Sequence, residues 1–61
     1  MTPYVVSYIS NNIPQTLIIQ SNSIEEALSI FREKNKNRAI ELFNIKSATP
    51  EDYKPGIPIL P

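Results

Sequence analysis

Apolar and polar positions alternate in two short runs at the start of the chain. Residues 4–9 are aromatic, β-branched and serine side chains bounded by Pro3, a composition typical of a β-strand. A second strand is predicted over residues 15–20. Asn11 and Asn12 accept the left-handed backbone of a turn, and Pro14 belongs in the turn or at an edge. The intervening residues 10–14 therefore favour an antiparallel hairpin with a loop longer than two residues.

The hydrophobic spacing then changes from two residues to the helical period. Ser23 and Glu26 match a capping box, in which each side chain bonds to the backbone of the other residue. The apolar residues that follow at helical spacing are Ile24, Ala27, Leu28, Ile30 and Phe31. This pattern predicts a helix that begins at Ile24 and buries one face. Residues 39–46 return to a strand-like composition and are predicted to form a third strand.

The element order predicts an α+β fold. A right-handed crossover from the second strand through the helix lays the third strand beside the first, which gives a β-β-α-β domain over residues 1–47. Its sheet is expected to be antiparallel and three-stranded, in the order 2-1-3, with the helix on one face. Residues 48–61 are predicted to form a short helical turn after Thr49, then an extended proline-rich tail docked on the domain.

Both faces of the predicted sheet carry apolar residues, although one helix can cover only one of them. Three covers for the second face remain open: the chain's own tail, a second copy of the chain, or a different protein. We expect the contacts with such a partner to involve Tyr4, Val6, Tyr8, Phe43, Ile57, Ile59 and Leu60.

Length and composition argue against an enzyme. A chain of 61 residues without His or Cys lacks the usual proton shuttle, thiolate nucleophile and zinc ligands. The four acidic residues that could supply paired carboxylates are explained by helix capping, and they are Glu25, Glu26, Glu51 and Asp52. We therefore predict a non-enzymatic protein that uses no metal and no cofactor.

The charge pattern supports one alternative function. Six basic residues balance six acidic ones, so the whole chain predicts no charged partner. Four of the six cations nevertheless cluster at the end of the helix and in the following turn, namely Arg32, Lys34, Lys36 and Arg38. They suit the negative end of the helix dipole. They could equally contact the phosphates of a nucleic acid, with Tyr4 and Tyr8 stacking on its bases.

The leading interpretation is a small accessory or inhibitor protein that binds another protein through an apolar sheet face or a strand edge, and that may form a homodimer. A third hypothesis is an assembly subunit whose edge strands pair between copies. No run approaches the roughly 20 apolar residues of a membrane span, and no signal peptide is evident, so we expect a cytoplasmic location. Ten Ile and six Asn beside a single Gly suggest AT-rich coding sequence, as in a virus or a low-GC bacterium.

Overall fold

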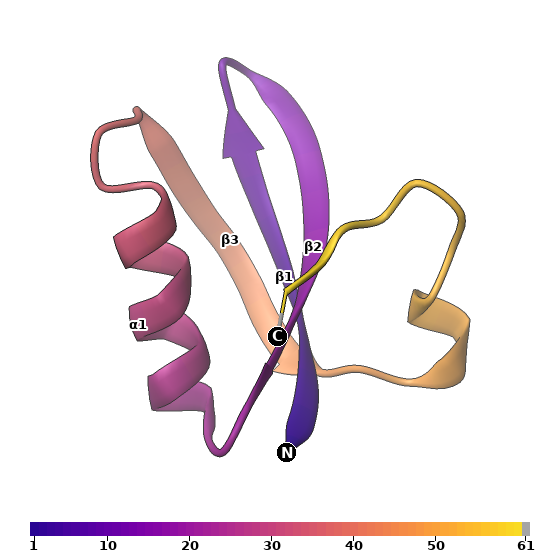
Figure 1. Ribbon diagram of the computed structural model, residues 1–61. Coiled ribbons are helices and arrows are strands. Elements are labelled where there is room, and N and C mark those ends of the chain that lie inside the picture. Colours follow the sequence, from indigo (N-terminus) through magenta and orange to yellow (C-terminus); the bar gives the residue numbers. More distant parts are fainter. Residues whose placement is uncertain (61) are drawn as a thin grey trace.

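Four strands form one mixed sheet, and a single helix covers one of its faces (Figure 1). The computed structural model describes residues 1–60. Its elements are β1 (Thr2–Ser10), β2 (Ile13–Ser21), α1 (Ile24–Lys34), β3 (Ile40–Ser47), the 3-10 turn η1 (Pro50–Asp52) and β4 (Ile59–Leu60). The strands lie in the order β3-β1-β2-β4. The predicted α+β class is confirmed.

The β1–β2 hairpin is tighter than predicted. Ser10 pairs with Ile13, so the loop holds two residues rather than five. Both loop residues are left-handed, with φ of 53° at Asn11 and 64° at Asn12, as a two-residue turn that follows the strand twist requires. Pro14 consequently lies inside β2, opposite Ile9.

Pro14 is tolerated there because its nitrogen faces away from β1. Four residues further along β2, the Ile18 N–H donates a hydrogen bond of 2.9 Å to the Pro58 carbonyl, which lies on the side of β2 away from β1. Backbone groups alternate between the two sides of a strand, so Pro14 has the same outward orientation as Ile18. No hydrogen bond to β1 is lost.

Helix α1 begins at Ile24 as predicted, but the Glu26 side chain bonds to the backbone of Asn22 rather than to that of Ser23. The Glu26 N–H donates 3.1 Å to the Ser23 hydroxyl oxygen, and the Glu26 carboxylate accepts 3.1 Å from the Asn22 N–H. The helix ends at Asn35, whose backbone N–H donates to the Arg32 carbonyl and whose side-chain amide donates to the Phe31 carbonyl. These bonds satisfy backbone groups at both ends.

The main core lies between α1 and the facing side of the sheet. Its buried members are Tyr4, Val6, Leu17, Ile19, Ala27 and Phe31. Half-buried side chains at its margin include Tyr8, Ile30, Ile40, Ile45 and Leu60. The helix thus covers alternate residues in the middle of the hairpin, namely Tyr4 and Val6 of β1 and Leu17 and Ile19 of β2.

The fourth strand corrects the prediction of a wholly antiparallel, three-stranded sheet. The three long strands have the expected order, but β4 adds to the free side of β2 and runs parallel to it, with Ile59 opposite Ile18 and Leu60 opposite Ile19. The prediction missed β4 because this strand depends on a tertiary contact. Its two residues lie between prolines and are held by the outward-facing backbone groups of β2, and no local sequence pattern reveals this pairing.

The second face of the sheet is partly covered by the chain itself. Val5 is 4% exposed and Ile18 is fully buried, although both point away from α1. The segment from Ala48 to Pro58 loops over the side of the sheet opposite the helix before it reaches β4 (Figure 1). Ile57 and Asp52 from this loop line the same small cavity as Val5.

Candidate protein-binding site

Three of the predicted partner-binding residues lie beneath the helix, and the structure corrects them. Tyr4 is 9% exposed and Val6 is fully buried in the core against α1. Tyr8 shares their face and packs on Phe31 of the helix, with ring centroids 5.1 Å apart. The helix covers Tyr4 and Val6, so these two side chains serve the core, whereas Tyr8 is only half-buried.

Phe43 lies on the opposite face of the sheet because β3 carries a bulge. Ser7 of β1 pairs with Asn44, and the next residue, Tyr8, pairs with Leu42. Phe43 is therefore the extra residue of β3, and the alternation of its side chains reverses there. Phe43 therefore does not share a face with Tyr4 and Tyr8. The bulge leaves the Phe43 side chain 77% exposed.

A shallow groove of about 360 Å³ lies beside Phe43 at the hairpin end of the open face. Ile9 and Pro14 from β1 and β2 contribute apolar walls, and Ser7 and Thr16 contribute hydroxyl groups. We call these five residues, Ser7, Ile9, Pro14, Thr16 and Phe43, the Phe43 patch. The covering loop lies over Val5 and borders a cavity that Ser7 and Thr16 also line, whereas Phe43 stays exposed.

The sequence interpretation missed Ile9 and Pro14 as members of this surface. Pro14 was assigned to a loop, whereas it lies in β2 opposite Ile9. One signal could have revealed the bulge: Leu42 and Phe43 are adjacent apolar residues, whereas the other apolar residues of the strand, Ile40 and Ile45, are each followed by a charged residue. A break in alternation of this kind marks an extra residue.

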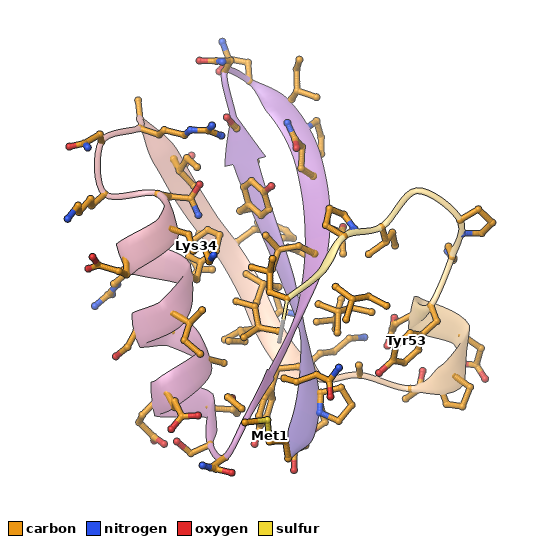
Figure 2. The ribbon with its side chains drawn as sticks, viewed as in Figure 1. Met1, Lys34 and Tyr53 are labelled. Atoms are coloured by element: carbon orange, nitrogen blue, oxygen red, sulfur yellow. The ribbon has the colours of Figure 1, made fainter. Side chains whose placement is uncertain are left out.

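The predicted tail residues divide between the two faces of the sheet. Leu60 packs at the margin of the helix-side core, and Ile57 is half-buried near Val5. Ile59 is 48% exposed. In Figure 2 the labelled Tyr53 lies in the loop with η1, on the far side of the sheet from α1. The tail residues thus contact the chain's own sheet, apart from the outward side of Ile59 and Pro61, which lies outside the described residues.

Three of the four clustered cations come together. Arg32, Lys36 and Arg38 line a groove of about 390 Å³ between the end of α1 and β3, with Phe31 and Ile40 among its apolar residues. Lys34 does not line this groove and is on the surface formed by Ser29, Ile30 and Glu33. Figure 2 labels Lys34 at the last turn of α1. Lys36 is partly neutralised by Glu33, at a distance of 3.3 Å.

The acidic residues have structural roles at element ends. Glu26 caps α1, and the Asp52 carboxylate accepts hydrogen bonds from the Thr49 N–H at 2.7 Å and the Thr49 hydroxyl at 3.2 Å. The backbone bond from Thr49 is the main reason that the pKa of Asp52 is lowered, and Lys46 and Lys54 lower it further. Among residues 1–60, no three acidic side chains gather in a way that could hold a metal ion.

Comparisons with protein-family models, with curated proteins and with solved structures found no match to this chain. Within residues 1–60, α1 is too short and too polar to cross a membrane.

Proposed function

We propose that this chain is a non-catalytic protein-binding protein whose contact surface is the Phe43 patch. The observation that carries the proposal is the exposure of Phe43, at 77%, beside a groove with apolar walls. An exposed phenyl ring at a bulge contributes little to the fold, whereas aromatic side chains at the centre of a patch dominate protein interfaces. The matching partner presents an aliphatic or aromatic side chain to the groove.

Burial of the sheet's other apolar residues supports this choice of surface. The helix covers Tyr4 and Val6, and the chain's own loop and β4 leave Val5 and Ile18 buried. Among the described residues of the sheet, Phe43 is the most exposed large apolar side chain, ahead of Ile13 at 57% and Ile59 at 48%. Apolar area removed from water stabilises a complex by about 25 cal/mol per Å² before the costs of association are subtracted.

Site-specific photo-crosslinking tests the proposal in the cells that produce the protein. A photoreactive phenylalanine analogue at position 43 is expected to capture a partner, whereas the same analogue at Ser29, on the exposed side of α1, is not. Excess unlabelled wild-type chain should suppress the product, and excess Phe43→Asp chain should not. Equal capture from both positions, or no capture of a different protein, would overturn the proposal.

A second candidate is binding to a nucleic-acid backbone, which the convergence of Arg32, Lys36 and Arg38 on one groove favours. Base stacking by the tyrosines is disfavoured, because Tyr4 is buried and the half-buried Tyr8 packs on Phe31. Three phosphate contacts would weaken binding to a single-stranded oligonucleotide about twentyfold between 50 and 200 mM salt. Fluorescence anisotropy with a random-sequence oligonucleotide measures this directly, and affinity that does not change with salt would exclude the candidate.

A further inference from the structure

The outer edge of β3 runs for eight residues, and no strand within residues 1–60 pairs with it. Its backbone orientation follows from one hydrogen bond. The Ala48 N–H donates a hydrogen bond of 2.9 Å to the Pro3 carbonyl of β1. Because backbone groups alternate along a strand, the N–H and C=O groups of Lys46 and Asn44 also face β1, and the N–H and C=O groups of Ser47 and Ile45 face outward.

The orientation beyond the bulge follows from the same alternation along β1. Pro3, Ser7 and Ile9 direct their backbone groups towards β3, so Glu41, opposite Ile9, faces inward. Leu42 and Ile40 then face outward. The outward-facing residues before and after the bulge are therefore Ile40, Leu42, Ile45 and Ser47.

This arrangement makes β3 complementary to a second, antiparallel copy of itself. When the two-fold axis passes between Phe43 and Asn44, Ile40 faces Ser47 of the second copy and Leu42 faces Ile45 of the second copy. All four of these residues direct backbone groups outward, so each pair can exchange two hydrogen bonds. The same register places Glu41 opposite Lys46 of the second copy, on the face away from α1.

We propose that the chain forms a homodimer in which the two β3 strands pair antiparallel in this register, joining two four-stranded sheets into one of eight strands. Glu41 and Lys46 are both exposed, and neither forms an ion pair within residues 1–60. In the dimer, Glu41 of each copy lies directly across the strand pair from Lys46 of the other copy. The two-fold symmetry therefore creates two pairs of opposite charge.

The bulge excludes neighbouring registers. Leu42 and Ile45 lie on the helix side of the sheet, whereas Glu41, Phe43, Asn44 and Lys46 lie on the other side. A slip by two residues that sets Glu41 opposite Asn44 also sets Leu42 opposite Phe43, whose side chains lie on different faces. A slip by one residue sets Glu41 opposite Ile45, with the same conflict. In the proposed register, every pair has both side chains on one face.

Dimerisation also changes the exposed surfaces on both faces. The Phe43 rings of the two copies meet beside the axis, so the two Phe43 patches become one continuous apolar surface. On the helix side, the two-fold axis runs the helices antiparallel, with the acidic start of one towards the basic end of the other. This inference goes beyond the proposed function, because the Phe43 patch can bind a different protein whether or not the β3 edges pair.

Charge reversal tests both the dimer and its register. Light scattering of the full chain over a hundredfold concentration range is expected to give a dimer of two 6.9 kDa chains. Glu41→Lys alone and Lys46→Glu alone each set two like-charge pairs across the interface, and each should weaken the dimer about tenfold. The double variant restores both pairs and should restore the affinity.

Mixing the two single variants gives the sharper result. One chain then offers lysines at 41 and 46 and the other offers glutamates, so the mixture should form a heterodimer that neither variant forms well alone. The charge of Lys46 also lowers the pKa of Asp52 in the η1 turn. Circular dichroism of each variant therefore checks that the fold is retained. A chain that stays monomeric at the highest concentration overturns the proposal. A dimer whose dissociation constant is unchanged by these substitutions also overturns it.

Cysteine pairs provide an independent measurement, because the natural chain has none. Residues 41 and 46 of different copies form a pair without mutual hydrogen bonds, with Cα atoms about 4.5 Å apart, which suits a disulfide. Within one strand they are about 17 Å apart and cannot bond to each other. E41C/K46C should therefore give a covalent dimer on mild oxidation. The matched control E41C/N44C should not, and preferential crosslinking of that control would overturn the register.

Discussion

The rings of Tyr8 and Phe31 pack against each other across the sheet and the helix, with centroids 5.1 Å apart and an interplanar angle of 59°. Tilted aromatic pairs of this kind add about 0.5–1.5 kcal/mol to the energy of area burial. The contact ties β1 to α1 near the end of the helix. It also explains why an aromatic residue on a strand, read from the sequence as a binding residue, serves the core.

Phe31→Ala is expected to remove a large part of the protein's free energy of unfolding at 25 °C. Removing a buried phenyl ring costs about 3–5 kcal/mol, and a domain of this length has a total stability of roughly 3–9 kcal/mol. Urea denaturation followed by circular dichroism measures the loss. Tyr8→Phe is the matched control: it keeps the ring contact and removes only the exposed hydrogen bond to Gln15, so a loss above about 0.5 kcal/mol would contradict the proposed role of the ring.

The hairpin turn offers a stabilising change. Asn12 has φ of 64°, which glycine adopts without strain. Asn12→Gly should therefore raise the free energy of unfolding by a few tenths of a kcal/mol, because the Asn-Gly pair is the preferred two-residue turn. Asn12→Ala should lower it by about 1 kcal/mol, since alanine resists the left-handed region. Thermal melts rank the three proteins, and equal melting temperatures would contradict the turn geometry.

These cases show which parts of the fold local chemistry could predict. Ser23 and Glu26 fix the start of α1 because both capping partners lie within four residues of each other. The role of Pro14 depends on which side of β2 its nitrogen faces, and β4 depends on a bond from Ile18 to Pro58, forty residues away in sequence. Such pairings are tertiary, and the sequence pattern carries no record of them.

The candidate site was predictable only in part for a related reason. Phe43 is among the residues that the sequence predicts to contact a partner, and its side chain is 77% exposed, so it stays a candidate. The face of Phe43 was not predictable, because Phe43 is itself the extra residue of β3 at which the alternation of side chains reverses. Tyr4 and Val6 could not be assigned to the covered face until the crossover of α1 was known.

The N-cap of α1 should contribute measurably to stability. Ser23→Ala removes the acceptor for the Glu26 N–H and is expected to cost about 1 kcal/mol. Ser29→Ala is the control, because Ser29 lies on the exposed side of the same helix and alanine is the better helix former. Chemical denaturation of both variants should separate them by at least about 1 kcal/mol, and a reversed order would contradict the capping role.

The loop that covers the second face should also contribute to folding. Ile57 is half-buried near Val5, so Ile57→Ala is expected to lower the free energy of unfolding by about 1 kcal/mol. Ile13→Ala, at a position that is 57% exposed, should have a clearly smaller effect. Hydrogen exchange at the Ile18 amide provides a local readout, since this N–H donates to Pro58. Unchanged protection there in Ile57→Ala would show that the loop and β4 are not coupled.

The turn at η1 should loosen in acid because of Asp52. The Thr49 N–H bond holds the pKa of this carboxyl below its ordinary value, so the folded turn favours the charged form. The resulting stabilisation is present above the unfolded pKa of about 4 and is lost as the pH falls through the lower, folded pKa. The Thr49 amide proton shift in an NMR titration should therefore move below about pH 4. Asp52→Asn should abolish that step and Glu51→Gln should preserve it, whereas a step that persists in Asp52→Asn would assign the acid response to another group.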